Sequence, residues 1–378
     1  MNFEVVITGN SFATNSLIFL LNTHFNINIA NIVPEISMIR DIKLFMPAAT
    51  LKNLSIPLKK LSDKNVASFN KIHLFLYNNQ RILSHNKKII VSTSLEKLKK
   101  ILLSLSPKPK NIKIFQNSIN EIFYNNDKFY IKLSNNKILT THYLIIGDDF
   151  WGNSWNFINY KPHHTGGWIV KIPNTKSIST IPFIALGYSK KSLILSDNQN
   201  LIFSKHIDKE YSIENLIINF LTNNQIIKNI ILSDWNKYVL PFSTKEQNFP
   251  EHLKNKKIFI ITEYLGLTSC LLPDFTYLTS FLVKEFIVNI DKTVNSFKDF
   301  IPYINKAIQY NQIFLKINNL INNFPLMFFN NSEKDEILVD LLLGNITPSE
   351  ADRMFKQIFE FYDRRFEVVL SARAQEEE

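Results

Sequence analysis

The sequence opens with a short hydrophobic run, a polar turn and a second hydrophobic stretch whose spacing is helical. The first run is Val5–Ile7, the turn is Thr8–Ser11, and residues 17–21 supply the apolar side of a helix. This order of strand, turn and helix is typical of nucleotide-binding units. A dinucleotide-binding turn usually contains three glycines, whereas this one contains only Gly9. The opening therefore predicts a nucleotide-binding unit with an altered turn.

Further apolar patterns predict strands and a helix in the first half of the chain. Residues 27–32 alternate as a second strand does, and Asn31 stands nearest to the position where a carboxylate usually binds a ribose. Residues 71–93 alternate around a polar turn and predict a hairpin, and residues 95–105 predict an amphipathic helix. Residues 137–146 end in a continuous apolar run, as a strand buried in a parallel sheet does.

The second half changes pattern. Short apolar runs between polar turns fill residues 160–245 and predict a mainly antiparallel sheet. A strand of the buried, parallel type returns at 256–264, and helices are predicted at 274–290 and 302–322. The residues that follow Arg40-Asp41 also read as helix-like.

The C-terminal stretch differs from the rest in composition. Residues 333–343 read as a helix that Gly344 ends, and Thr347–Glu350 contain an N-cap, a proline at the first helical position and a capping-box glutamate. The second helix is predicted to run to about residue 374. Residues 333–378 carry a charge balance of −6, although the whole chain has a net charge of +10. We expect a helical hairpin that packs on the body or on a partner protein.

Charge and composition narrow the function classes. The basic excess is mostly lysine spread along the chain, and only Arg40 and Arg81 are arginines before residue 353, so we expect no nucleic-acid partner. The single cysteine excludes an internal disulfide, and the pair His163-His164 has no further ligands in the sequence pattern, so no metal site is predicted. No run of 18 apolar residues is present, and the expectation is a cytoplasmic protein, with peripheral contact at the inner membrane left open.

The order of segments resembles the FAD-dependent aromatic hydroxylases of the para-hydroxybenzoate hydroxylase fold. Within that fold it is most similar to the ubiquinone-biosynthesis (2-polyprenylphenol) hydroxylase family, over about residues 3–325. The resemblance implies an α/β fold: a Rossmann-like FAD-binding domain, an inserted, mainly antiparallel sheet of the substrate domain, and the C-terminal helical hairpin. The implied boundaries are 1–70, 95–155 and 255–330 for the FAD-binding type of domain, 71–94 and 156–254 for the substrate-type domain, and 331–378 for the hairpin.

The resemblance also assigns cofactor-binding positions. The family's three turn glycines correspond to Gly9, Ser11 and Thr14, and its nucleotide-binding arginine corresponds to Arg40. Its Gly-Ala-Asp-Gly segment corresponds to Gly147 through Asp149 and Phe150, and its ribityl-binding aspartate corresponds to Glu263. Glycines let backbone N–H groups approach a pyrophosphate closely, so their loss at three segments bears directly on FAD binding.

Two functions follow from these observations. The first is an FAD-dependent monooxygenase that uses NAD(P)H and hydroxylates a polyprenylated phenol in ubiquinone biosynthesis; no catalytic residue is identified. The alternative is a non-catalytic family member, a scaffold or lipid-binding partner in a quinone-biosynthesis assembly, with residues 331–378 as its docking element. A flavoprotein of another type, such as a prenyl reductase or halogenase, is a third and weaker reading. The enzyme requires Glu263 to face the crevice of Gly9 and Arg40, whereas Phe150 and Leu272 filling the flavin space favours the alternative.

Overall fold

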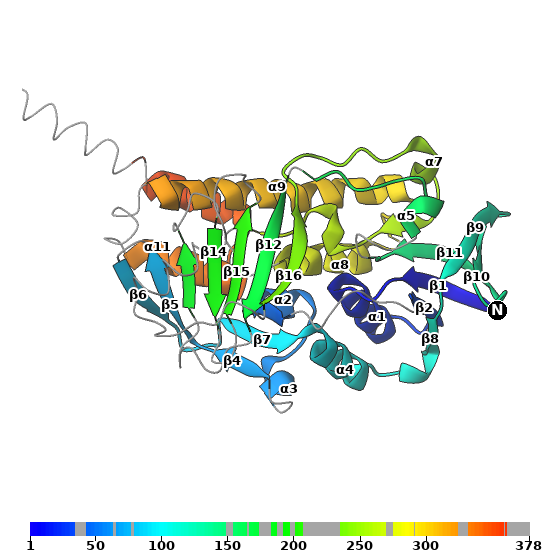
Figure 1. Cartoon of the computed structure of the whole chain (residues 1–378), viewed down its shortest axis with the longest axis horizontal. Helices are drawn as coiled ribbons and strands as arrows, with labels where there is room; N and C mark the ends of the chain where they lie inside the picture. Colours follow the sequence, from blue (N-terminus) through cyan, green and yellow to red (C-terminus); the bar gives the residue numbers. More distant parts are fainter. Residues whose placement is uncertain are drawn as a thin grey trace, which may run out of the picture.

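The computed structural model of the chain describes most of the sequence. The described residues are 1–34, 43–62, 66–76, 79–148, 154–164, 166–173, 183–186, 192–196, 201–206, 235–269, 275–290, 292–323, 332–358 and 360. Figure 1 shows two main sheets side by side, with long helices packed along them.

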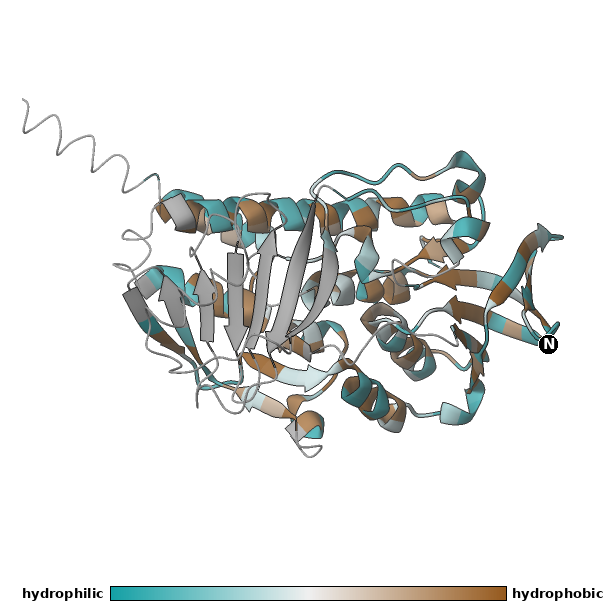
Figure 2. Ribbon diagram, viewed as in Figure 1, coloured by the Kyte–Doolittle hydropathy of each residue, from teal (hydrophilic) through white to brown (hydrophobic). Residues whose placement is uncertain are grey.

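The first sheet is the Rossmann-like part of the fold. Its strands lie in the order β8-β2-β1-β11-β10-β9, and β17 pairs with β11. The bounds are β1 (Asn2–Thr8), β2 (Ile29–Val33), β8 (Ile112–Gln116), β9 (Ile119–Asn125), β10 (Lys128–Leu133), β11 (Ile138–Ile146) and β17 (Ile258–Ile260). β8, β2, β1, β11 and β17 are parallel neighbours, whereas β9 and β10 form an antiparallel extension. The carboxyl-terminal parts of β1 and β11 and the whole of β2 and β17 are buried and mostly apolar, as Figure 2 shows by their hydrophobic colours, whereas the edge strand β8 is largely exposed.

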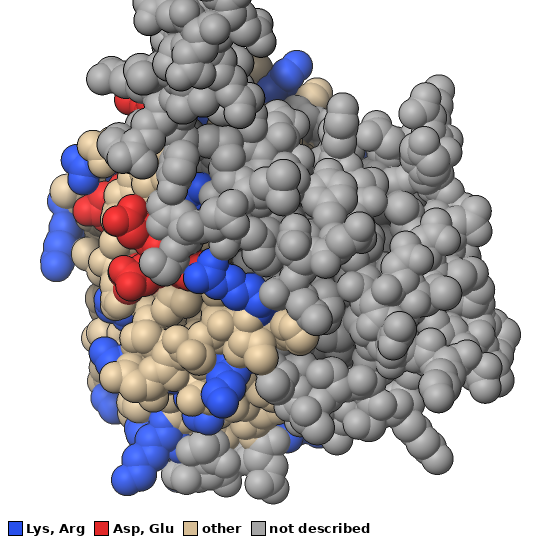
Figure 3. Space-filling view, turned by 90° about the vertical axis from the view of Figure 1, so that its left-hand side faces the viewer, with Lys and Arg blue, Asp and Glu red and all other residues tan. Residues whose placement is uncertain are grey.

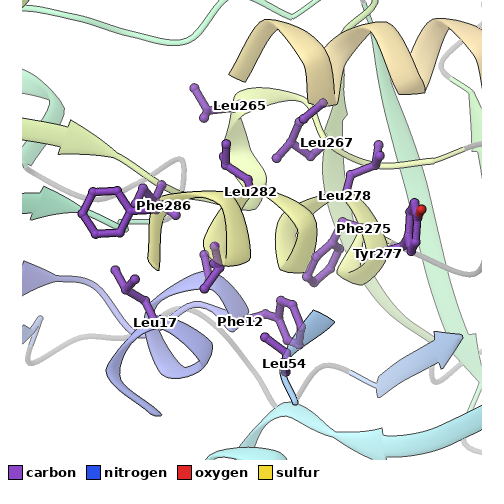
Figure 4. Packing of buried hydrophobic residues seen from close by; sticks show 14 of the residues in the cluster. Phe12, Leu17, Leu54, Leu265, Leu267, Phe275, Tyr277, Leu278, Leu282 and Phe286 are labelled. Carbon is purple, nitrogen blue, oxygen red and sulfur yellow. The ribbon is translucent and has the colours of Figure 1, made fainter. Parts of the chain in front are cut away.

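Helices cover the first sheet, and the helix that follows β1 is buried among them. Their bounds are α1 (Phe12–His24), α4 (Leu95–Leu105), α5 (Ser154–Phe157), α7 (Glu251–Lys254), α8 (Thr276–Asn289) and α9 (Phe297–Asn323), with 3-10 turns η1 (Pro109–Asn111) and η2 (Glu263–Leu265). α1 packs against α8, and Phe12 meets Phe275 edge to face at a centroid distance of 6.0 Å. Figure 4 shows these rings beside Leu54. Because α1 is covered on several sides, its N-terminal turn is buried.

The second sheet is the inserted one. Its order is β16-β12-β15-β14-β13-β5-β6, antiparallel except for the parallel pair β13 and β5. The bounds are β5 (Lys71–Leu76), β6 (Asn79–Ser84), β12 (Gly166–Pro173), β13 (Phe183–Leu186), β14 (Ser192–Ser196), β15 (Leu201–His206) and β16 (Trp235–Phe242). The mixed α/β fold class with an inserted, mainly antiparallel sheet is thereby confirmed.

Three local predictions need correction. The helix-like segment after Arg40-Asp41 begins instead with β3 (Lys43–Pro47), and the helix α2 (Ala48–Asn53) starts only after Pro47. The run Leu44–Met46 is buried in β3, and a short buried apolar run has no periodicity that separates strand from helix. Residues 90–93, expected in the hairpin, belong instead to β7 (Ile90–Ser94) in a separate sheet.

This third sheet has the order β3-β7-β4. Its strand β4 spans Ala67–Phe69, and the helix α3 (Leu58–Ser62) precedes β4 in the chain.

The third correction concerns the strand predicted over 256–264, which is confined to β17 (Ile258–Ile260). Thr262 then caps the 3-10 turn η2. Residues 207–234, which belong to the region predicted as a mainly antiparallel sheet, lie outside the described residues.

The C-terminal helices pack on the body. α11 (Ser332–Leu343) contacts α2, and Gly344 ends it with a φ of +68°, a value that suits glycine. The Thr347 hydroxyl accepts from the Glu350 N–H at 3.3 Å, and the Glu350 carboxylate accepts from the Thr347 N–H at 2.7 Å, which completes the expected capping box of a helix over 348–358.

An ion pair joins the inserted sheet to these helices. Arg81 of β6 lies 2.7 Å from Asp335 of α11, from Nε to Oδ2. Figure 3 views this end of the molecule, where acidic side chains gather beside basic ones. Within the described residues, no helix is both long and apolar enough to cross a membrane.

Candidate functional site

The carboxyl ends of three parallel strands meet at the N-terminus of α1. β1 leads into Gly9, β11 leads into Gly147, and β17 leads into the turn that carries Glu263. Ligands of open α/β sheets bind at this kind of edge. Five of the seven predicted cofactor-binding residues, Gly9, Ser11, Thr14, Gly147 and Glu263, come together here. Arg40 and Asp149 lie outside the described residues.

Gly9 occupies the tight turn after β1. Its φ is +97°, and its N–H donates to the carbonyl oxygen of Ile32 at 2.8 Å. A Cβ built on Gly9 would lie 2.5 Å from the carbonyl oxygen of Gly147. The turn glycine is therefore required by backbone conformation and by the close crossing of the two strand ends.

Ser11 stands where the resemblance places a second glycine, and it caps α1. Its backbone is extended, with φ −88° and ψ 174°, so the position needs no glycine conformation. The hydroxyl accepts a hydrogen bond from the Thr14 N–H at 3.1 Å. The carbonyl oxygen accepts from the Asn15 N–H at 3.1 Å and from the Asn15 side chain at 2.8 Å. The residue thus starts the helix in the ordinary way of an N-cap serine.

Thr14 takes the third glycine position and joins α1 to β11. Its hydroxyl lies 3.1 Å from the carbonyl oxygen of Gly147, 3.4 Å from that of Thr8, and 3.1 Å from the Ser11 hydroxyl. The side chain is fully buried. Helix and strand therefore pack through a hydrogen-bonded hydroxyl where the family packs through a glycine.

Glu263 reaches the N-terminal turn of α1 from the other side. Its Oε1 accepts from the Phe12 N–H at 3.2 Å, and its Oε2 accepts from the Ala13 N–H at 3.3 Å. Burial raises the pKa of Glu263 to about 7, against the opposing effect of the backbone N–H groups and of the Ser11 hydroxyl. Glu263 therefore faces the N-terminal turn of α1, next to Gly9, whereas Arg40, which the enzyme hypothesis places in the same crevice, lies outside the described residues.

The turn below Glu263 is fixed by Thr262. The Thr262 hydroxyl donates to the carbonyl oxygen of Asp148 at 2.9 Å and accepts from the Tyr264 N–H at 3.3 Å. Asp148 is itself buried, and its carboxylate accepts from the Ser154 N–H at 3.1 Å. Burial raises the pKa of Asp148. The hydrogen bond between Thr262 and Asp148 had no signal in the sequence pattern, because the two residues are 114 positions apart.

Asn31 and Lys99 mark a small hollow beside α1. The hollow is lined by α1, α4, β2 and β8 and includes Asn15, Asn31 and Lys99. Lys99 donates to the Asn10 side chain at 2.8 Å, and sequence reasoning missed it. Among the residues that the structure describes, Asn31 Oδ1 is buried and has no hydrogen-bond partner. Asn31 therefore lines this hollow, which includes none of the residues Gly9, Ser11, Thr14, Gly147 and Glu263.

The N-terminal turn of α1 is closed to an FAD pyrophosphate. A pyrophosphate at a helix N-terminus needs the N–H groups of the first turn. In this conformation the N–H groups of Phe12 and Ala13 already bind Glu263, and Ser11 and Thr14 fill space that glycines leave open. The residues therefore do not fit a pyrophosphate as they stand. Phe150 and Leu272, which would fill the flavin space in the non-catalytic alternative, lie outside the described residues.

Hydrogen bonds and burial account for the surroundings of the pair His163-His164. The Gln247 side chain accepts from the His163 N–H at 2.8 Å and donates to the His163 carbonyl oxygen at 2.7 Å. Burial lowers the pKa of His164 to about 4. In the described part of the chain, no group of three or more His, Cys, Asp or Glu side chains is placed to hold a metal ion.

Comparison with known proteins identifies the fold. No family model and no curated protein matches the sequence. A probable FAD-dependent monooxygenase, pqsL of Pseudomonas aeruginosa, matches with a TM-score of 0.61 and 8% identity, over 90% of this chain and 100% of that one. The p-nitrophenol 4-monooxygenase PnpA of Pseudomonas putida DLL-E4 matches with 0.58 and 10%, over 94% and 98%. A geranylgeranyl bacteriochlorophyll reductase-like protein of Thermoplasma acidophilum matches with 0.60 and 12%, over 94% and 91%. At these identities the comparison shows the fold, which is that of FAD-dependent monooxygenases and related flavoproteins.

Proposed function

We propose that the chain is an FAD-dependent oxidoreductase of the monooxygenase type. One observation carries this proposal: β1, β11 and the turn after β17 bring Gly9, Gly147 and Glu263 together at the N-terminus of α1. In dinucleotide-binding folds this is the place of the cofactor. The likeness of the fold to flavin monooxygenases over nearly the whole chain supports the same reading. FAD, when bound, supplies the redox chemistry of this class of protein.

The substrate and reductant are narrower proposals. The resemblance of the sequence to the ubiquinone-biosynthesis hydroxylases supports a polyprenylated phenol as substrate and NAD(P)H as reductant. It also supports a cytoplasmic protein with peripheral contact at the inner membrane. A protein partner on residues 331–378 is a further proposal, and the acidic balance of that segment supports it.

A second candidate is the non-catalytic scaffold or lipid-binding partner in a quinone-biosynthesis assembly. The position of Glu263 favours it, because the carboxylate holds the N–H groups that an FAD pyrophosphate needs. The first-turn N–H groups that Glu263 binds need no cofactor anion to satisfy their hydrogen bonds. Fold alone does not decide between the two candidates.

A measurement of FAD binding distinguishes the enzyme from the non-catalytic candidate. The purified full-length chain is titrated with FAD, and binding is followed by quenching of flavin fluorescence and by absorbance near about 450 nm, a property of the cofactor class. Saturable uptake, followed by NAD(P)H oxidation that a polyprenylated phenol stimulates, is the expected result. The enzyme proposal is overturned if neither the wild type nor a Glu263→Ala variant takes up FAD.

A further inference from the structure

The N-terminal turn of α1 lacks an acidic residue of its own. No Asp or Glu stands in the first turn of the helix, which spans 13 residues. A helix N-terminus carries partial positive charge and unpaired N–H groups, and it favours an anion nearby. Glu263, which is 251 positions from Phe12 in the sequence, supplies that anion.

The carboxylate of Glu263 binds as an external anion would. Its two oxygens each accept from one of two consecutive N–H groups, those of Phe12 and Ala13. The side chain is 4% exposed, so water does not compete for these hydrogen bonds. In geometry, the carboxyl group takes the role that a phosphate group takes at such a turn.

The two residues in place of glycines support this arrangement. The Ser11 hydroxyl lowers the pKa of Glu263, against the larger effect of burial, and it lies 3.1 Å from the Thr14 hydroxyl. The Thr14 hydroxyl donates in turn to the carbonyl oxygen of Gly147. Both side chains are fully buried beside the turn. The three departures from the family pattern, Ser11, Thr14 and Glu263, therefore meet at one helix turn.

The length of the side chain at position 263 determines whether its carboxylate reaches the N–H groups of α1. The resemblance places an aspartate here, and glutamate is longer by one methylene, about 1.5 Å of covalent reach. The backbone of this turn is held by Thr262, and the Gly266 N–H donates to the Glu263 carbonyl oxygen at 3.2 Å. Because the backbone is anchored, the additional methylene brings the carboxylate to α1, and an aspartate would fall short.

We propose that Glu263 is an intramolecular competitor of FAD, whose carboxylate occupies the pyrophosphate position and must leave α1 before the cofactor binds. This inference rests on the proposed function, because it names the side chain that controls occupancy of the same site. It predicts that removing or shortening the side chain at 263 strengthens FAD binding.

The experiment measures FAD affinity of four full-length proteins: wild type, Glu263→Ala, Glu263→Asp and, as a matched control, Glu251→Ala. Glu251 is an exposed carboxylate paired with Lys254 at 2.7 Å, so its variant removes one charge away from α1. We expect at least about tenfold tighter FAD binding in Glu263→Ala and Glu263→Asp than in the wild type, and no change in Glu251→Ala. Should Glu263→Ala fail to fold, Glu263→Asp carries the comparison alone.

A second probe, inorganic pyrophosphate, distinguishes failure of this inference from failure of the proposed function. Its binding is measured as a rise in the melting temperature of each protein. If all proteins bind FAD with one affinity, the inference is overturned and the proposed function stands. If none binds FAD but pyrophosphate stabilises only the Glu263 variants, the proposed function fails and occupation of the anion site by Glu263 is supported. If neither probe distinguishes the Glu263 variants from the wild type and none binds FAD, both are overturned.

Discussion

The hydroxyl of Thr14 donates a hydrogen bond of 3.1 Å to the carbonyl oxygen of Gly147. The bond joins the first turn of α1 to the end of β11, two elements 133 positions apart in the sequence. Thr14 is fully buried, so the bond has little competition from water. This contact fixes how closely the helix and the strand approach at the candidate site.

Replacing Gly147 with alanine should therefore destabilise the protein. A Cβ at this position would overlap the Thr14 hydroxyl and lie 2.9 Å from the Thr8 carbonyl oxygen. We expect Gly147→Ala to cost about 2–4 kcal/mol in urea unfolding. The double variant Gly147→Ala with Thr14→Ala should recover part of this loss, since one of the two overlaps is removed. Equal losses in the single and double variants would show that the Thr8 contact dominates instead.

Gly9 should be more sensitive to alanine than Gly344. Both have a positive φ, of +97° and +68°. A Cβ on Gly9 would lie 2.5 Å from a backbone oxygen, whereas one on Gly344 would lie 3.0 Å from the Ala49 Cβ. We expect about 1–3 kcal/mol of destabilisation from conformation at each position, and a larger further loss from overlap at Gly9 than at Gly344. Thermal unfolding of the two variants side by side gives the comparison, and a larger loss in Gly344→Ala would contradict it.

The local parts of the site follow from local sequence signals. β1 and α1 were predictable because Val5–Ile7 form a buried run and Ser11 is a standard N-cap residue directly before the helix. The capping box of Thr347 and Glu350 was predictable for the same reason. Each of these features depends on residues within one turn of each other.

The remaining parts depend on contacts between distant residues. Nothing near Glu263 in the sequence indicates that its carboxylate binds Phe12 and Ala13, because the position alone reads as a substitute for a ribityl-binding aspartate. The pairing of β7 with β3 and β4 was missed for a similar reason, since alternation predicts a strand but not its neighbour. The sequence therefore predicted five of the residues that meet at the N-terminus of α1, and it left their contacts undetermined.

Truncation of Phe355 should loosen the C-terminal helices. Phe355 and Ala351 are fully buried on the helix over 348–358. We expect Phe355→Ala to lower the free energy of unfolding by about 3–5 kcal/mol and to speed proteolytic cleavage of residues beyond 332. Arg353→Ala, on the exposed side of the same helix, is the control and should leave both quantities nearly unchanged. Equal cleavage of the two variants would mean that the helix does not depend on this packing.

Glu263 should make stability depend on pH. Burial raises its pKa from 4.5 to about 7 in the folded state. The folded protein then holds a proton between these values that the unfolded chain has released, so this group's contribution to stability is full below about pH 4.5 and falls as the pH rises to about 7. A shift of this size corresponds to about 3 kcal/mol, at about 1.4 kcal/mol per pH unit.

Other groups also make the stability depend on pH, so a variant is needed to isolate the contribution of Glu263. Asp148, at the end of β11, has a raised pKa and gives a slope of the same sign. His164, whose pKa falls from 6.5 to about 4, gives the opposite slope, because the unfolded chain binds the proton first. The described groups that face the Glu263 carboxylate are the N–H groups of Phe12 and Ala13 and the Ser11 hydroxyl, none of which titrates in this range.

The informative quantity is therefore the difference between Glu263→Gln and the wild type. Glutamine has no proton to lose, while the slopes from Asp148 and His164 remain in both proteins and cancel in the difference. The unfolding free energy of Glu263→Gln minus that of the wild type should rise by about 3 kcal/mol between pH 4.5 and pH 7, measured by urea unfolding at each pH. A flat difference would mean that Glu263 ionises in the folded state as it does in water. The carboxylate would then bind α1 as a stable anion, and its competition with FAD would be strongest at neutral pH.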